Sequence, residues 1–331
     1  MKKRVAINGF GRIGRAAARI IMQDHKDTLE LVGINDPSPI EQSALLMAYD
    51  SNFGRYPGTI EAKGDDTLVI DGKEVAKFTT RNIEDLPWGD LEVDVVLECT
   101  GVFRTKEGAS KHVDQGAKKV VISAPGKDDS FDTYVIGANC DTIRGDEVLV
   151  SNASCTTNCL APIAKVLNDE FGIESGLMTT IHAYTTSQPV LDLGGSDMRR
   201  GRAAALNMVP TSTGAAKAVA LVIPELKGKL TGMAVRVPTP TVSLVDLTVK
   251  VKKTATVEQI KAAMKAASEK NPHILGYSDK PLVSIDFKQD SRSSIFDADS
   301  TYVMGDLVKV MSWYDNEWGY SCRLVELAEK L

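Results

Sequence analysis

The spacing of hydrophobic residues changes along the chain and divides it into two parts. Up to about residue 150, short β-rich runs alternate with helical stretches, which is typical of a mainly parallel sheet with helices on both faces. The strongest of these runs are 4–9, 29–35, 93–99, 118–123 and 148–151. Within this part, alternation on both sides of Asp71-Gly72 predicts a small hairpin.

Beyond residue 150 the hydrophobic runs are longer and partly alternating, which predicts a mainly antiparallel sheet. These runs cover 177–186, 233–237, 242–252 and 307–313. Helices expected at about 158–170, 210–222 and 256–270 would cover this sheet, and 317–331 has the pattern of an amphipathic helix. Pro162 lies inside the first helix, where it either kinks the helix or is tolerated near its first turn. The fold class is therefore α/β, with a doubly wound parallel sheet and a second, α+β domain.

A glycine motif near the start of the chain predicts that the first domain is of the Rossmann type and binds a dinucleotide. Gly9, Gly11 and Gly14 follow a β-rich run and open an alanine-rich helical stretch. Gly9 allows a tight turn, Gly11 lets a pyrophosphate approach the backbone, and Gly14 lets the helix pack closely on the strand. The backbone N–H groups of Arg12 and Ile13, at the start of this helix, would face the phosphates.

An acidic residue at the end of the next β-rich run completes the dinucleotide pattern. Asp36 lies 22 residues past Gly14 and follows the run 29–35. Its carboxylate can accept hydrogen bonds from the ribose of adenosine. It would repel a 2′-phosphate by roughly several kcal/mol at an effective dielectric near 20. The sequence therefore predicts NAD, in preference to NADP, as the cofactor.

Cys155 is the strongest candidate for a catalytic nucleophile. It follows the hydrophobic run 148–150 and stands among Ser, Asn and Thr residues, which favour helix starts. In the first turn of a helix, backbone N–H groups and the helix dipole favour the thiolate, so we expect the pKa of this thiol to be lowered. The alternative is a buried structural cysteine. Beside a dinucleotide domain, a reactive cysteine suggests oxidation of an aldehyde through a thioester.

Three segments resemble the phosphorylating, glycolytic glyceraldehyde-3-phosphate dehydrogenase family: INGFGRIGR at 7–15, ASCTTNC at 153–159 and WYDNEWGY at 313–320. The likeness runs nearly end to end. It implies NAD-dependent oxidation of D-glyceraldehyde 3-phosphate to 1,3-bisphosphoglycerate, with inorganic phosphate as the acyl acceptor, and a homotetramer. It also implies that residues 1–151 and 316–331 form the NAD-binding domain and residues 152–315 the catalytic domain.

The resemblance assigns roles to individual residues. His182, within the segment IHAYT at 181–185, matches the catalytic base, and it shares stabilisation of the oxyanion with the Cys155 N–H. The matched cofactor contacts are Arg81, Thr100, Ser123 and Asn316. The matched contacts to the substrate phosphate are Thr185, Arg200 and Arg236, and those to the attacking phosphate are Ser154, Thr156, Thr213 and Gly214.

Some of these residues have plausible alternative roles. Asn316 can orient the nicotinamide carboxamide, and it can equally cap the C-terminal helix. The arginines at 199, 200 and 202 can instead form a solvated or interface cluster. The loop 192–197 departs from the Pro-His-Lys sequence that is usual in the family. Gly194 and Gly195 leave the backbone of this loop free to adopt many conformations. Exclusion of NADP would therefore rest chiefly on Asp36.

Composition limits the partners and the compartment. The chain has 331 residues, a net charge of −5 and no basic block, so neither nucleic acid nor an anionic membrane is an evident partner. The glycine turn interrupts the first apolar stretch too early for a signal peptide. Five cysteines, an odd number, form no disulfide framework, which indicates a reducing cytoplasm. No set of metal ligands accompanies them.

Three other functions remain open from the sequence. Erythrose-4-phosphate dehydrogenase would use the same thiol chemistry with water as the acyl acceptor. A cysteine acyltransferase or hydrolase would need no dinucleotide, so the complete glycine motif argues against this class of enzyme. A nucleotide-sensing module without turnover would not need both Cys155 and His182.

Overall fold

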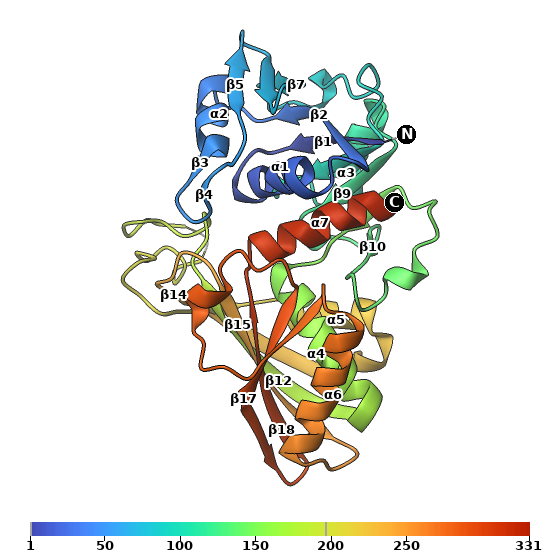
Figure 1. Cartoon of the computed structure of the whole chain (residues 1–331), viewed down its shortest axis with the longest axis vertical. Helices are drawn as coiled ribbons and strands as arrows, with labels where there is room; N and C mark the ends of the chain where they lie inside the picture. Colours follow the sequence, from blue (N-terminus) through green and yellow to red (C-terminus); the bar gives the residue numbers. More distant parts are fainter. Residues whose placement is uncertain (1, 196) are drawn as a thin grey trace. The chain divides into compact units, whose positions relative to one another are not determined.

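The computed structural model describes residues 2–195 and 197–331, and the chain divides into two compact units (Figure 1). The first unit comprises the chain up to Tyr134 together with Asp141–Ala153 and Ser321–Leu331. The second comprises Val135–Cys140 and Ser154–Tyr320. Within the described residues, no helix combines the length and the apolar character needed to cross a membrane.

The first unit is built on a nine-stranded sheet with the order β10-β11-β9-β8-β1-β2-β7-β6-β5. The strands are β1 (Lys3–Asn8), β2 (Leu29–Asn35), β5 (Ile60–Lys63), β6 (Thr67–Ile70), β7 (Lys73–Phe78), β8 (Val95–Glu98), β9 (Lys119–Ile122), β10 (Asp132–Thr133) and β11 (Leu149–Ser151). From β10 to β7 all neighbours are parallel, while β6 and β5 add antiparallel strands at one edge. The turn at Asp71-Gly72 joins β6 to β7, which confirms the predicted hairpin.

Chain order reverses around β1, as expected for a doubly wound sheet. The chain passes from β1 to β2 on one side, and β8 later pairs with the other side of β1. In such sheets, ligands bind beyond the carboxyl ends of the strands that flank the reversal. The helices of this unit are α1 (Arg12–Asp24), α2 (Ile40–Ala48), α3 (Lys106–Asp114) and the part of α7 (Trp318–Lys330) from Ser321 onward. A small ribbon pairs β3 (Tyr49–Asp50) with β4 (Gly54–Arg55).

The second unit contains a seven-stranded sheet with the order β13-β14-β12-β15-β18-β17-β16. Its strands are β12 (Ile173–Ala183), β13 (Val209–Ser212), β14 (Leu230–Val237), β15 (Ser243–Val251), β16 (Leu275–Ser278), β17 (Ser294–Met304) and β18 (Leu307–Tyr314). The pairs β12–β14 and β16–β17 are parallel and the others are antiparallel, so the sheet is mainly antiparallel as predicted.

Three helices cover this sheet: α4 (Cys155–Phe171), α5 (Ala215–Val222) and α6 (Val257–Lys270). Helix α4 contacts both other helices and packs on β15 and β17 (Figure 1). Helix α6 begins with a capping box, in which the Thr256 and Gln259 side chains accept each other's backbone N–H. Short 3₁₀ turns lie at Ile83–Asp85, Cys140–Thr142, Pro224–Leu226 and Ser284–Phe287.

The helix predicted over 210–222 is wrong at its start. Val209–Ser212 instead form β13, which pairs only with β14 at the edge of the sheet, and α5 begins at Ala215. An edge strand tolerates Pro210 because one side of it donates no hydrogen bond to a neighbouring strand. Helix α4 continues through Pro162, although the missing N–H leaves one helical hydrogen bond unmade.

Gly14→Ala should destabilise the protein because α1 lies directly against the glycine turn. A Cβ built at Gly14 falls 2.1 Å from the Gly9 carbonyl oxygen. We expect a loss of about 1–3 kcal/mol, read as a lower thermal midpoint. Gly11→Ala is the matched control, since a Cβ at Gly11 meets no atom within 4 Å. It should cost less than about 1 kcal/mol. Equal midpoints for the two variants would contradict this packing.

Candidate active site

Cys155 is the first residue of α4, as predicted. Ser154 caps the helix, and its Oγ accepts the Thr157 N–H at 3.0 Å. The cap places the Cys155 side chain at the start of the helix, where it is partly exposed. The second candidate, His182, lies on β12 and is 5% exposed. Its Nε2 is 3.4 Å from the Cys155 Sγ, so the structure brings the two predicted catalytic residues together.

The far side of the imidazole contacts both an acceptor and a donor. Nδ1 of His182 lies 2.7 Å from the carbonyl oxygen of Ala183, which can only accept. A proton on Nδ1 satisfies this carbonyl and turns the Nε2 lone pair toward the thiol, although the Arg236 Nη1, which can only donate, also lies 2.8 Å from Nδ1. In this tautomer the imidazole can accept a proton from Cys155.

Arg236 lies beside His182 because the two residues are direct partners in the parallel pair β12–β14. Its Nη1 donates to the Ala183 carbonyl at 2.9 Å and lies 2.8 Å from the His182 Nδ1. The sequence pointed to Arg236 as a phosphate ligand but did not reveal this contact with the base. Only the register of two strands far apart in the chain shows it.

The pair is electrically neutral at rest, which corrects one expectation from the sequence. Burial, reinforced by the nearby Arg236 cation, lowers the pKa of His182 to about 3. Burial also raises the pKa of the Cys155 thiol, and neither Arg236 nor hydrogen bonds at Thr156 reverse that direction. The predicted lowering of the thiol pKa at a helix start is therefore wrong here, because desolvation disfavours the thiolate. A neutral thiol faces a neutral imidazole.

Tyr314 is a structural member of the site to which the sequence analysis gave no role. Its hydroxyl lies 2.9 Å from the Thr156 Oγ1 on α4 and 2.9 Å from the Thr180 Oγ1 on β12. Its ring meets the His182 ring edge to face, with centroids 6.1 Å apart. Thr156 is 3% exposed and its hydroxyl is occupied by Tyr314. A phosphate contact from Thr156 would therefore use its backbone N–H.

Arg200 is held by its own loop. Its Nε donates to the Thr211 Oγ1 at 2.7 Å, and its Nη2 donates to the Ser212 carbonyl at 3.1 Å. Asp197 pairs with the same Nε at 3.3 Å. The charge of Arg200 contributes to lowering the pKa of both His182 and Arg236, so it lies within electrostatic reach of the site.

The other predicted phosphate ligands lie at the ends of elements in the second unit. Thr185 follows β12, and its hydroxyl is 2.9 Å from the Ser187 Oγ. Gly214 is the N-cap of α5, and the Thr213 Oγ1 accepts the Ala215 N–H at 3.2 Å. Of the divergent loop, Ser196 lies outside the described residues.

The glycine motif forms a turn against which the segment after β8 packs. Gly9 has φ +94°, and a Cβ there would fall 2.7 Å from the Thr100 backbone nitrogen. Gly11 precedes α1 without any side-chain cap, and the space that its Cβ would occupy is open. Arg12 and Ile13 begin α1. An open helix start of this kind fits a pyrophosphate.

Asp36 points back toward this turn. Its Oδ2 accepts the Phe10 N–H at 3.0 Å, and its Oδ1 accepts the Ser38 N–H at 2.9 Å. Burial would raise the pKa of Asp36, but the hydrogen bonds from Ser38 and Phe10 and the Lys77 charge outweigh burial and lower it. The carboxylate is therefore ionised at neutral pH and can accept from a ribose hydroxyl.

The remaining cofactor candidates divide between the two units. Arg81, Thr100 and Ser123 follow β7, β8 and β9, beyond the carboxyl ends of parallel strands. Asn316 belongs to the second unit, where its Oδ1 accepts from the Ser243 Oγ at 2.9 Å. It does not cap α7. That role belongs to Asp315, whose Oδ1 accepts the N–H groups of residues 317 and 318, each at 2.9 Å.

Comparison with known proteins shows that both parts of the chain match models of the same family. The family model "Glyceraldehyde 3-phosphate dehydrogenase, NAD binding domain" matches residues 3–106, and the C-terminal domain model of the same family matches residues 154–316. Glyceraldehyde-3-phosphate dehydrogenase 2 of Trichormus variabilis is 56% identical over 98% of this chain and 97% of its own length. The Zymomonas mobilis enzyme is 52% identical over 100% and 99%. The chloroplastic GAPA1 protein of Arabidopsis thaliana is 52% identical over 99% and 83%.

The neutral His182 predicts a measurable pH dependence of stability. Its pKa is about 3 in the folded protein against an ordinary value of 6.5, so unfolding takes up a proton between these pH values. The free energy of unfolding is therefore not reduced by this histidine above pH 6.5, and it falls as the pH drops from 6.5 toward 3. The slope from this one group is at most about 1.4 kcal/mol per pH unit. His182→Asn should flatten the pH dependence of the free energy of unfolding by that amount. Parallel curves for wild type and His182→Asn would contradict the assignment.

Proposed function

Because the chain belongs to the glyceraldehyde-3-phosphate dehydrogenase family, we propose that it oxidises D-glyceraldehyde 3-phosphate with NAD and inorganic phosphate to give 1,3-bisphosphoglycerate. Family membership makes the chain an enzyme of this type with NAD as its cofactor. The observation that supports the proposed chemistry best is the 3.4 Å contact between the Cys155 Sγ and the His182 Nε2.

Cys155 forms the covalent bond to the substrate. Its Sγ attacks the aldehyde carbon while the S–H proton passes to the His182 Nε2 and then to the aldehyde oxygen, which gives a hemithioacetal. The Cys155 backbone N–H and His182 stabilise the negative charge that develops on this oxygen. Proton transfer during attack removes the need for a resting thiolate, which the raised pKa of the thiol disfavours.

The oxidation and the release of product follow on the same carbon. Bound NAD supplies the acceptor for the hydride of the hemithioacetal carbon. His182 takes the hydroxyl proton as a thioester forms on Cys155. Inorganic phosphate then attacks the thioester carbon and displaces the Cys155 sulfur, which leaves as a thiolate and regains its proton from His182.

Two anion sites would hold the phosphates. For the substrate phosphate we propose Thr185, Arg200 and Arg236, since guanidinium groups and hydroxyls match phosphate oxygens. For the attacking phosphate we propose Ser154, Thr156, Thr213 and Gly214, which include the starts of α4 and α5.

The cofactor would be held mainly by the first unit. We propose that Gly9, Gly11, Arg12, Ile13 and Gly14 receive the pyrophosphate and that Asp36 receives the adenosine ribose. Arg81, Thr100, Ser123 and Asn316 would complete the contacts.

We further propose a homotetramer in the cytoplasm. All five cysteines are free, which suits a reducing compartment. The names of two similar plant proteins, from Arabidopsis thaliana and Zea mays, place those proteins in the chloroplast.

An assay of NADH formation tests the reaction. With glyceraldehyde 3-phosphate and NAD, multiple turnovers should require inorganic phosphate. Cys155→Ser should lose at least about 10³-fold in kcat and still bind NAD. Cys140→Ser, a change at a cysteine outside the site, should keep wild-type turnover. Faster, phosphate-independent oxidation of erythrose 4-phosphate would favour the related dehydrogenase instead, and turnover in Cys155→Ser would refute the thioester route.

Asp36 should set the preference between the two dinucleotides. Its ionised carboxylate repels a 2′-phosphate, so wild type should show a higher kcat/KM with NAD than with NADP. Asp36→Ala should narrow that ratio by about tenfold or more, mainly by lowering the KM for NADP. The related change Asp65→Ala, at an exposed carboxylate, is the control. A wild-type enzyme that prefers NADP would overturn the choice of cofactor.

A further inference from the structure

Three adjacent parallel strands of the first unit end in buried polar residues that hydrogen bond to one another. The strands β8, β1 and β2 are neighbours in the sheet and end at Glu98, Asn8 and Asn35. These residues are 1%, 1% and 5% exposed. Each stands one or two positions before a proposed cofactor contact: Glu98 before Thr100, Asn8 before Gly9, and Asn35 before Asp36.

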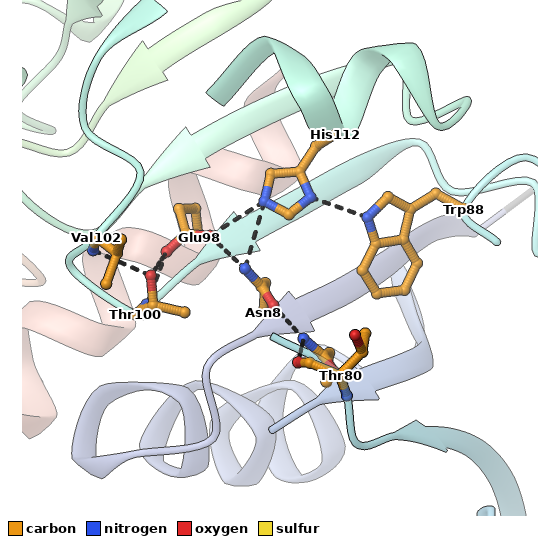
Figure 2. A network of polar contacts seen from close by, with 8 residues as sticks. Asn8, Thr80, Trp88, Glu98, Thr100, Val102 and His112 are labelled. Carbon is orange, nitrogen blue, oxygen red and sulfur yellow. Dashed lines mark hydrogen bonds and ion pairs between the residues drawn. The ribbon is translucent and has the colours of Figure 1, made fainter. Parts of the chain in front are cut away.

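Side-chain amides connect the three strand ends. The Asn8 Nδ2 donates to the Glu98 Oε2 at 2.6 Å, and the Asn35 Nδ2 donates to the Asn8 Oδ1 at 2.7 Å. The Asn35 Oδ1 accepts the Thr80 N–H at 3.2 Å, which extends the network to the segment before Arg81 (Figure 2). The network therefore runs across the edge of the sheet where the proposed cofactor residues lie.

His112, whose tautomer is determined by a hydrogen bond from Trp88, contacts the Glu98 carboxylate. Figure 2 shows His112 between Trp88 and Glu98. The Trp88 Nε1–H can only donate, and it donates to the His112 Nδ1 at 2.9 Å. The proton of a neutral imidazole is then on Nε2, which lies 3.1 Å from the Glu98 Oε2. All three side chains are at most 1% exposed.

The other oxygen of Glu98 holds the segment that packs on the glycine turn. Its Oε1 accepts the Thr100 N–H at 2.8 Å and also the Thr100 hydroxyl. Gly9 lies directly against this segment, since a Cβ there would be 2.7 Å from the Thr100 nitrogen. The two oxygens of one carboxylate thus accept four donors and join the end of β1 to the segment after β8.

We propose that Glu98, supported by His112, is a positioning residue for NAD, which sets the Gly9 turn and Thr100 at the separation that the cofactor needs. The inference rests on the proposed role of Gly9, Gly11 and Thr100 in binding NAD. A carboxylate suits the position because both of its oxygens accept and neither donates, so none of the four donors faces another donor. A glutamine would place an N–H₂ group against at least one of these donors.

The test compares the same substitution at two buried carboxylates of this unit. Glu98→Gln should raise the Kd for NAD, measured by calorimetric titration, by about tenfold or more. Glu147→Gln is the control. Glu147 is 2% exposed and accepts from the Tyr134 hydroxyl at 2.7 Å, but it does not belong to this network. The control should leave the Kd unchanged even where its thermal midpoint falls. An unchanged Kd in Glu98→Gln, or an equal rise in both variants, would overturn the proposal.

A second pair of variants carries the test if Glu98→Gln does not fold. In His112→Gln the amide can accept from Trp88 and donate to Glu98, so NAD affinity should stay within about threefold of wild type. His112→Leu can do neither and should weaken NAD binding by about tenfold, while the rate of Cys155 labelling without NAD stays unchanged. Equal Kd values for these two variants would contradict the proposal.

The variant Gly11→Ala distinguishes a failure of the positioning role of Glu98 from a failure of the proposed NAD site. If Gly11→Ala weakens NAD binding and neither Glu98→Gln nor His112→Leu does, only the positioning role fails. If Gly11→Ala leaves NAD affinity unchanged, the proposed NAD site itself fails.

Discussion

The position of the His182 ring against the start of α4 determines the chemistry that the second unit can perform. Its Nε2 faces the Cys155 Sγ at 3.4 Å, while its Nδ1, on the other side of the ring, lies 2.7 Å from the Ala183 carbonyl oxygen. The carbonyl is fixed in turn by Arg236, which donates to it from the neighbouring parallel strand. Sheet register therefore places both the Ala183 carbonyl and the Arg236 guanidinium beside Nδ1, and Nε2 is the nitrogen that faces the sulfur.

Burial acts on both members of this pair in the direction of neutrality. It raises the pKa of the thiol and lowers the pKa of the imidazole, to which Arg236 adds its positive charge. A site whose two partners are neutral holds no ion pair at rest. Donors such as the Cys155 N–H can then stabilise charge that appears during the reaction. In the first unit, by contrast, four converging donors compensate the buried Glu98 carboxylate.

Much of this architecture could be predicted from local sequence pattern, and the exceptions have physical causes. The glycine turn, the hairpin at Asp71-Gly72 and the helix that begins at Cys155 depend on near neighbours in the chain, and all three were predicted. Residues 210–212 were predicted to be helical, yet they belong to the edge strand β13, which pairs with β14. Long-range pairing of this kind overrides local propensity.

The site shows the same division between local and long-range information. The position of Cys155 at a helix start follows from its neighbours, whereas its pKa depends on burial by residues far away in sequence. The contact of Arg236 with His182 depends on the register of β12 and β14, and the network around Glu98 depends on which strands are neighbours. None of these has a signal within a short window of sequence.

The Tyr314 hydroxyl has a further mechanical consequence for the reactive sulfur. It holds a single proton and lies at equal distance from the threonine hydroxyls of α4 and β12. It can donate to one of them only, so the other must donate to it. The three hydroxyls thus orient as a group, and they form a cross-brace from the last strand to the helix beneath Cys155. A shift of α4 along the sheet would have to break these hydrogen bonds, so a polar contact that takes no part in the chemistry helps to keep sulfur and imidazole aligned.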